Sequence, residues 1–562
     1  MFILRPSIYA MQKIVALLLI LTSMKASAQS VDLVNEQPKL VVGIVIDQMR
    51  QEYLYRYYSK YSEGGFKRLM NDGFMLKNAH YNYQPTYTGP GHASIFTGTT
   101  PSFHGIIGND FYDKRTDKIV NCVEDPIQKL VGSETGLGNI SPWRMLTSTI
   151  TDELKLFTQK RAKVIGISIK DRSAVLPAGH MADAAYWYDN SSGKFITSTF
   201  YRMKLPDWLI KFNSLNLSDK YLSQTWNTLL PIDQYIESGP DDSPYELKFG
   251  TKLKPTFPYV LSELRQKYRS FDLLTTTPFA NNLLTELAMA TLEGEQMGKD
   301  NITDFLCVSY SSTDLLGHAV GPNAVELEDM YLRLDRSLEE FFKKLDQQVG
   351  IGNYTLFLTA DHGVADVPQF LKDNKIPAGY FNEEYVKAKL NEFLVSYFPN
   401  KLLIANISNR QIFLNQDAFQ HDAKSTGVDM YIVTELIGKF LMSIEGVANY
   451  YTQALIQQGN YDEKGEKGDI IRGYNTQRSG DIVYTLQPGW IELGTVQGST
   501  HGSSYRYDTH VPVLFYGKGI KKGSSSLYHS ITDIAPTLSV LLKIKFPNSC
   551  TGQPIVEILD SN

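Results

Sequence analysis

The sequence predicts an α/β protein, a three-layer sandwich built on a mostly parallel sheet and interrupted by two insertions. Segments 40–46, 304–310 and 354–360 are largely apolar and do not alternate with polar residues. Such runs are typical of strands buried on both faces, as in parallel sheets. Segment 323–348 lies between the second and third runs and repeats apolar residues at helical spacing. Strand–helix alternation of this kind builds α/β sandwiches.

The N-terminus carries the pattern of a secretory signal peptide. A basic start at Met11–Lys13 precedes the apolar run 14–21, and the small residues Ala26, Ser27 and Ala28 follow. This order predicts cleavage after Ala28 and a periplasmic or secreted protein. No later stretch reaches about 18 uninterrupted apolar residues, so no membrane span is expected.

The core begins with strand 40–46, and a second strand is predicted at 162–169. Asp47 directly follows the first strand and Lys170 follows the second. The carboxyl ends of parallel strands lie at one edge of the sheet, where α/β folds place their ligands. Both residues are therefore candidates for a site.

Thr88 opens the stretch Thr-Gly-Pro-Gly-His, which predicts the start of a helix. Pro90 suits the first turn of a helix. Thr88 is either an N-cap, a common use of threonine, or a nucleophile held where the helix N-terminus favours an anion. This stretch alone leaves both interpretations open.

The rest of the chain alternates between core and insertion. Segment 186–278 is irregular and rich in Tyr, Trp, Pro, Ser and Asp, and is expected to pack beside the core without joining its sheet. The second insertion should carry helices at 384–397 and 431–442 and a Gly-rich loop at 461–480. The predicted segments are 1–28 (signal peptide), 29–185 (core), 186–278 (insertion), 279–366 (core), 367–486 (insertion) and 487–562 (core).

Net charge and cysteine content limit the possible partners and disulfides. The net charge is −5 and no basic block occurs, so a nucleic-acid partner is not expected. Of three cysteines, Cys307 lies in an apolar run and is expected to be a buried core thiol. Cys122 and Cys550 could form a disulfide in an oxidising compartment, which the sequence leaves open.

Carboxylates and imidazoles gather at predicted strand ends and loops. Asp314 and His318 stand at i and i+4, so one helical turn places both on one face. Asp361 and His362 follow strand 354–360, and His501 lies in a Gly/Ser-rich loop. Singly, each could be a cap or a structural residue. Together with Asp47 they suit zinc, and also manganese, in an oxygen/nitrogen site.

The order of these residues resembles the alkaline phosphatase superfamily, most closely the branch shared with nucleotide pyrophosphatase/phosphodiesterases, whose nucleophile is threonine. The resemblance implies two Zn²⁺ ions, with additional metals left open. One would be held by Asp314, His318 and His501, and the other by Asp47, Asp361 and His362 with Thr88 as nucleophile. Asn109, in Ile-Ile-Gly-Asn-Asp, matches the family asparagine that hydrogen-bonds a phosphoryl oxygen.

Lys170 and Arg172 refine the expected substrate. In an extended segment, an i, i+2 spacing points both cations to one side. A phosphate monoester dianion carries charge that a diester lacks, so two cations favour the monoester. The alternative is a surface pair neutralised by Asp171. The Lys-x-Arg pattern is similar to the signature of PafA-type alkaline phosphatases, an exported monoesterase group.

The resemblance therefore implies an exported zinc phosphomonoesterase that acts through a phosphothreonine. We also expect a monomer that acts on a broad range of small phosphate monoesters, although the sequence itself identifies neither the oligomeric state nor the natural substrate. A phosphodiesterase or nucleotide pyrophosphatase of the same superfamily is the main alternative. A sulfatase is disfavoured because the nucleophile position holds Thr88 instead of Cys or Ser. An exported binding protein with a degenerate site is also disfavoured, because every expected ligand is present.

Overall fold

A computed structural model of the chain describes residues 37–560, except 135, 137, 267–269, 400–401 and 421–429. The predicted signal peptide, 1–28, lies outside the described residues. Within the described part of the chain, no helix is both long and apolar enough to cross a bilayer.

The central sheet of the described residues has ten strands, and its middle strands are parallel. Its order is β21 (Gly523–Ser525), β2 (Phe74–Leu76), β20 (Val513–Gly517), β13 (Tyr354–Thr359), β1 (Leu40–Ile46), β12 (Asp304–Tyr310), β7 (Val164–Ser168), β8 (Ala184–Asp189), β9 (Lys194–Ser198) and β6 (Leu130–Val131). Strands β13, β1, β12, β7 and β8 run parallel. Every residue of β1, β12 and β13 is buried, as their apolar sequences predict.

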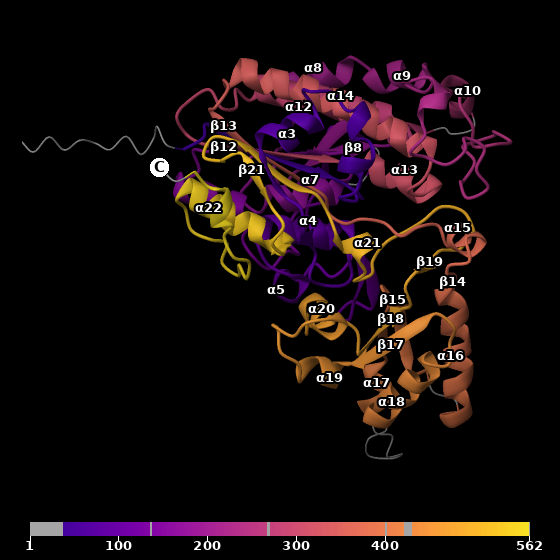
Figure 1. Cartoon of the computed structure of the whole chain (residues 1–562). Coiled ribbons are helices and arrows are strands. Elements are labelled where there is room, and N and C mark those ends of the chain that lie inside the picture. The colour runs from indigo at the N-terminus through magenta and orange to yellow at the C-terminus, as the bar shows by residue number, and fades with distance from the viewer. Residues whose placement is uncertain are drawn as a thin grey trace, which may run out of the picture. The chain divides into compact units, whose positions relative to one another are not determined.

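Helices cover both faces of this sheet (Figure 1). Helices α12 (Pro278–Gly294) and α14 (Val325–Gln348) lie on one face. Helices α4 (Thr88–Thr97), α7 (Asp171–Ala178) and α22 (Ile534–Leu542) lie on the other. The predicted three-layer α/β sandwich is therefore confirmed.

Shorter elements complete the described fold. The further helices are α2 (Tyr53–Arg56), α3 (Phe66–Asp72), α5 (Pro101–His104), α6 (Ile150–Phe157), α8 (Asp207–Ser214), α9 (Leu217–Leu222), α10 (Leu261–Arg265), α11 (Asp272–Thr275), α13 (Ser312–Val320), α15 (Pro368–Asp373), α17 (Gln416–Gln420), α19 (Gln453–Gln457) and α21 (Arg506–Thr509). Two-stranded pairs are β3 (Ala79–His80) with β22 (His529–Ser530), β4 (Asp110–Asp113) with β5 (Lys118–Asn121), β10 (Thr225–Trp226) with β11 (Tyr259–Val260), and β14 (Gly379–Phe381) with β19 (Trp490–Glu492).

The start of the first insertion was predicted wrongly. Strand β9 and the last four residues of β8 fall inside 186–278, yet both strands belong to the central sheet. Tyr186 and Trp187 pair with Ile167 and Ser168 of β7 and are buried. The sequence Ala-Ala-Tyr-Trp-Tyr-Asp lacks the aliphatic run that marks a buried strand, although aromatic residues favour strands. The described remainder of the segment contains α8 to α11 and the β10–β11 pair.

The second insertion has its own sheet and core. Its strands are β15 (Ile404–Ser408), β16 (Gln411–Leu414), β18 (Ile482–Leu486) and β17 (Val447–Thr452), all antiparallel to their neighbours. Helices α16 (Glu383–Tyr397) and α18 (Met430–Leu441) occupy the predicted helical segments. A separate cluster of buried apolar side chains, including Leu390, Val433 and Ile437, joins them to the sheet.

The predicted loop at 461–480 is wrong, because helix α20 (Glu466–Gly473) lies within it. Gly465, with φ +78°, caps the helix, and Ile470 is buried. The glycines suggested a loop, but Gly468 is needed for packing. A Cβ there would lie 1.8 Å from the carbonyl oxygen of Glu463.

All three cysteines are free. The sulfur of Cys122 faces Gly89 and that of Cys550 faces Gly98, at opposite ends of α4. Nine residues at 1.5 Å each separate those glycines by about 13 Å, far beyond disulfide reach. The possible Cys122–Cys550 disulfide is therefore absent. Cys307 is buried in β12, as predicted.

Candidate active site

The predicted site residues meet at the carboxyl edge of the parallel strands. Asp47 follows β1 and Lys170 follows β7, while Asp361 lies just past β13. Helix α13 begins soon after β12 and carries Asp314 and His318 on one face. Apart from His318, these side chains are almost fully buried.

Thr88 is the first residue of α4, and its side chain does not cap the helix. Tyr87 is the N-cap, in an extended conformation. The interpretation of Thr88 as an N-cap is therefore wrong, because the helix begins one residue earlier than that role requires. The Thr88 hydroxyl lies 3.5 Å from the Lys170 ammonium. A Cβ at Gly91 would lie 2.4 Å from the Asp361 carbonyl oxygen, so glycine lets the helix approach Asp361.

Two groups of ligand-type atoms each gather within 4.8 Å. One consists of Asp314, His362 and His501, and the other of Asp47, His92 and Asp361. The Nε2 atom of His318 lies 3.2 Å from Asp314 Oδ1, which adds it to the first group. The rings of His362 and His501 stack with centroids 3.4 Å apart. All six predicted ligands thus come together, while their division between two metals stays a prediction.

The three predicted histidine ligands share one hydrogen-bonding arrangement. Their Nδ1 atoms face backbone carbonyl oxygens, which can only accept, so each Nδ1 carries the proton. The pairs are His318 with Ser499 (2.8 Å), His362 with Gly363 (2.9 Å) and His501 with Thr86 (2.7 Å). Each Nε2 lone pair is left facing the carboxylates. Imidazoles that bind metals are held in this way.

Buried atoms without partners fit a bound cation. Asp361 Oδ2 and His362 Nε2 are buried and make no hydrogen bond. Burial without a partner costs roughly 1–3 kcal/mol for each group, more for a charged one. Burial and the neighbouring Asp47 carboxylate also raise the pKa of Asp361 well above its ordinary value. A divalent cation would satisfy both atoms, so the oxygen and nitrogen donors fit a metal centre.

Lys170 is a buried cation at the centre of this cluster. Its Nζ lies 2.9 Å from Asp47 Oδ2 and 2.5 Å from Asp314 Oδ2, and its side chain is 8% exposed. Burial lowers the pKa of Lys170, but the Asp314 and Asp47 carboxylates outweigh it and raise the pKa above its ordinary value. The interpretation of Lys170 as part of a surface pair is therefore wrong.

Arg172 has a different backbone conformation from the one predicted. The chain is extended at Lys170, but Asp171 begins α7, so Arg172 lies in a helical turn. The extended i, i+2 argument is therefore wrong, because the helix begins between the two cations. The Arg172 side chain is 20% exposed, and its guanidinium lies 3.7 Å from Asp171.

Asn109 stands beside the start of α4. Its Oδ1 accepts a hydrogen bond from the Gly89 N–H at 2.7 Å. The acceptor side of the amide is thereby used, and its NH₂ group is the donor that can serve a substrate oxygen.

Gln48 and His92 are site residues that the sequence analysis missed. Gln48 is buried with φ +63° and donates from its backbone to Asp361 and from its side chain to Asp314. No local pattern indicated it. His92 donates from Nδ1 to the Thr88 carbonyl oxygen, and its Nε2 pairs with Ser309. Its position one helical turn after Thr88 was the available signal.

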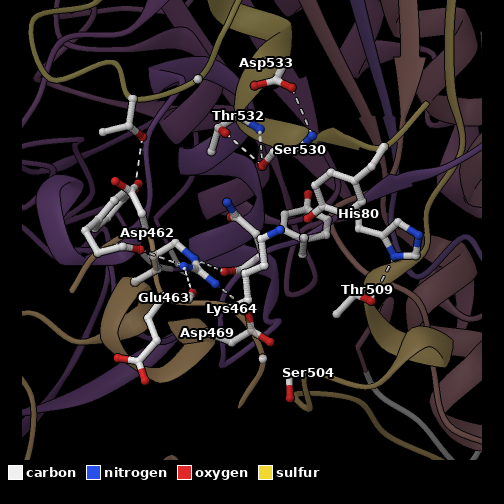
Figure 2. Close-up of a pocket in the computed structure, with 18 of the residues that line it drawn as sticks. His80, Asp462, Glu463, Lys464, Asp469, Ser504, Thr509, Ser530, Thr532 and Asp533 are labelled. Carbon is white, nitrogen blue, oxygen red and sulfur yellow. Dashed lines mark hydrogen bonds and ion pairs between the residues drawn. The ribbon is translucent and has the colours of Figure 1, made fainter. Parts of the chain in front are cut away.

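A large separate cavity, of about 700 Å³, lies between the second insertion and the core (Figure 2). His80, Asp469 and Thr509 line it, and none of the predicted site residues does. Arg472, on its wall, donates to the carbonyl oxygens of Asn82, Tyr461 and Glu463 and to the Asp469 carboxylate. Arg472 thus fastens the insertion to the core.

Comparison with known proteins gives the family. The type I phosphodiesterase / nucleotide pyrophosphatase family model matches residues 41–505, a range that contains every predicted site residue. The chain belongs to this family. It is 46% identical to alkaline phosphatase PafA of Elizabethkingia meningoseptica over 93% of this chain and 95% of that protein. It is 44% identical to alkaline phosphatase PhoV of Synechococcus elongatus over 93% of each chain.

The structure of this chain also matches a solved structure of a relative. The crystal structure of PafA superimposes with a TM-score of 0.89 at 44% identity, covering 93% of this chain and 99% of that one. The predicted resemblance to the PafA-type alkaline phosphatases is confirmed.

Proposed function

We propose that the chain is an exported, zinc-dependent phosphate monoester hydrolase with Thr88 as its nucleophile. The observation that carries the proposal is the gathering of three carboxylates and three Nδ1-protonated imidazoles, all buried except His318, around the Thr88 hydroxyl and the Lys170 ammonium. The names of the relatives at 44–46% identity support the monoester assignment.

Six residues would hold the metals. By the family resemblance, Asp314, His318 and His501 would hold one Zn²⁺, and Asp47, Asp361 and His362 the other, with Thr88 beside it. His362 lies between the two sets, because its Nε2 is 3.3 Å from Asp361 Oδ2 while a ring nitrogen is also within 4.8 Å of the ligand atoms of Asp314 and His501. When bound, paired zinc ions lower the pKa of a hydroxyl and stabilise charge on attacking and departing oxygens.

The residues of the chain carry the rest of the mechanism. The Thr88 oxygen attacks phosphorus, the bond to the ester oxygen breaks, and the alcohol leaves as phosphothreonine forms. Water then attacks phosphorus, inorganic phosphate leaves and the hydroxyl is restored. Asn109, Lys170 and Arg172 hold the non-bridging oxygens, where negative charge must be balanced in the transition state.

Rates on phenyl phosphate and on a phenyl phosphodiester test the assignment. Thr88→Ala should lower turnover of the monoester at least about 100-fold. Lys170→Ala combined with Arg172→Ala should lower the monoester rate about 10- to 100-fold more than the diester rate. The monoester carries one more negative charge than the diester, and one charge-assisted contact contributes about 1.5–3 kcal/mol. Lys204→Ala, at an exposed lysine, is the matched control.

The same assay decides between the two candidate functions. The family model favours a phosphodiesterase or nucleotide pyrophosphatase as the second candidate. A wild-type preference for the diester, or equal losses on both substrates in the double variant, would establish that candidate instead.

Export and assembly belong to the same proposal. Cleavage after Ala28 predicts that the mature protein from the periplasm or medium begins at Gln29. N-terminal sequencing measures this directly, and an uncleaved N-terminus would contradict it. We also propose a monomer that acts on small phosphate esters of broad range, which size-exclusion chromatography and a substrate panel would check.

A further inference from the structure

We propose that the second insertion completes the active site through one β-turn, in which Asn409 and Arg410 are positioning residues for the Asn109 and His501 loops. This inference rests on the proposed function, because it assigns roles to Asn109 and His501. It gives the second insertion a part in the reaction itself.

Asn409 and Arg410 form a β-hairpin turn with a defined backbone conformation. Strands β15 and β16 pair up to Ser408 and Gln411, which leaves Asn409 and Arg410 as a two-residue hairpin loop. Their φ values are +55° and +59°. Two successive positive φ angles define a type I′ turn, in which Asn is favoured at the first position.

Asn409 holds the loop that carries Asn109. Its Nδ2 donates to the Asp110 carbonyl oxygen at 2.7 Å. A Cβ at Gly108 would lie 2.7 Å from the same nitrogen, so the amide lies directly against the backbone on both sides of Asn109. The Asn109 side chain also contacts α4, because its Oδ1 accepts a hydrogen bond from the Gly89 N–H. Asn409 therefore fixes the position from which Asn109 would meet a phosphoryl oxygen.

Arg410 holds the loop that carries His501. It is 2% exposed and donates to the Gly502 carbonyl oxygen at 3.2 Å, with Glu492 as its counter-ion at 3.4 Å. On the other side of the same residue, the Gly502 N–H donates to Asp508. The Gly502 peptide units are thus held on both sides, next to His501.

Gly502 also connects Arg410 to the nucleophile. Its φ is +123°, and a Cβ there would lie 2.6 Å from the ring of Tyr87, the residue before Thr88. The hairpin turn therefore contacts the backbone beside Asn109 and beside His501, and it reaches the start of the nucleophile helix through Gly502 and Tyr87. Asn109 and His501 belong to core segments on opposite sides of the insertion in the sequence.

These contacts lie outside the apolar core of the insertion. The insertion has a separate apolar core, and Arg472 fastens it to the core domain at another point, beside the cavity of Figure 2. The turn buries the Arg410 guanidinium, and both this group and the half-buried Asn409 amide have their partners across the interface. This arrangement is expected of residues that position a site.

Glycine substitutions separate positioning from folding. Glycine adopts positive φ readily, so Asn409→Gly and Arg410→Gly keep the turn and remove only the side chains. Lys375→Gly is the matched control, because Lys375 also has positive φ (+63°) and is exposed in the same insertion. All variants are compared with wild type by melting temperature, phenyl phosphate kinetics and zinc content.

Asn409→Gly should lower kcat/KM for phenyl phosphate about 10- to 100-fold, as losses of outer hydrogen-bond partners do. The decisive readout is non-additivity: in an Asn109→Ala background the same change should have almost no further effect. Unchanged kcat/KM in Asn409→Gly, or an equal loss in both backgrounds, overturns the role of Asn409.

Arg410→Gly should speed the loss of zinc to a chelator about 10- to 100-fold, measured as metal retained after gel filtration. Unchanged retention overturns the role of Arg410. If Arg410→Gly fails to fold, Arg410→Lys keeps the charge, and wild-type zinc retention together with wild-type kinetics in that variant would likewise overturn it. If instead Asn109→Ala and Thr88→Ala retain full activity, the proposed function itself has failed.

Discussion

Gly317 of α13 leaves room for Gln48, and an added methyl group should destabilise the protein through that contact. A Cβ at Gly317 would lie 1.9 Å from Gln48 Oε1 and 3.0 Å from its Cδ. The Gln48 side chain is buried and cannot swing into solvent, because its Nε2 donates to Asp314 at 2.8 Å. Gly317→Ala must therefore break this hydrogen bond or displace α13.

The size of the effect follows from three contributions. A hydrogen bond to a charged group contributes about 1.5–3 kcal/mol. Overpacking of a buried site costs about 1–3 kcal/mol. Alanine in place of glycine stabilises a helix by about 1 kcal/mol, which offsets part of this loss. The free energy of unfolding should fall by about 1.5–5 kcal/mol.

Thermal melting of the full chain measures this loss. An unfolding entropy of about 2.1 cal/mol/K per residue makes 1 kcal/mol equal to about 1 °C for a chain of this length, so Tm should fall by about 1.5–5 °C. The control is Gln48→Gly, which removes the side chain and suits φ +63°. In that background Gly317→Ala should be neutral or stabilising. An equal fall of Tm in both backgrounds would refute the reasoning.

Three further predictions concern pH, thiols and metal. Burial raises the pKa of Glu246 and of Glu326, and nearby carboxylates raise both further. The unfolded chain releases these protons near pH 4.5 while the folded chain keeps them, so stability should fall as pH rises from there towards the folded pKa values. Glu326→Gln should therefore raise Tm at pH 8 but not at pH 4, and a pH-independent difference would contradict this. Because Cys122 and Cys550 are unpaired, a reductant should leave Tm unchanged, and a reductant-dependent fall would show a disulfide. Chelator treatment should abolish phenyl phosphate hydrolysis and added zinc should restore it, whereas full activity of metal-free protein, verified by elemental analysis, would exclude a metal role.

The buried strands could be predicted because their signal is local. Segment 304–310 was predicted with the bounds that the structure gives, since a run buried on both faces has to be apolar throughout. The strand at Ala184–Asp189 has aromatic residues in place of aliphatic ones and was assigned to an insertion. Helix α20 was hidden by glycines that serve close packing. In both cases tertiary contacts decide the structure.

The site residues also divide into those that the sequence predicts and those that it does not. Asp47, Asp314 and Asp361 could be found because parallel strands bring their carboxyl ends to one edge, so position along the chain predicts proximity. Gln48 and Arg410 could not be found. Their roles depend on positive φ angles and on distant partners, 266 and 313 residues away for Gln48 and 92 residues away for Arg410, which no local pattern records.

Charge balance gives a further reason to expect a phosphate monoester. The carboxylates of Asp47, Asp314 and Asp361 oppose the cations Lys170 and Arg172, and the histidines proposed as ligands would be neutral when a metal is bound. With two divalent cations bound, the site would carry three excess positive charges. A phosphate monoester dianion together with ionised Thr88 supplies three negative charges, whereas a diester monoanion supplies one fewer. In a buried site, where an uncompensated charge is costly, this difference favours the monoester.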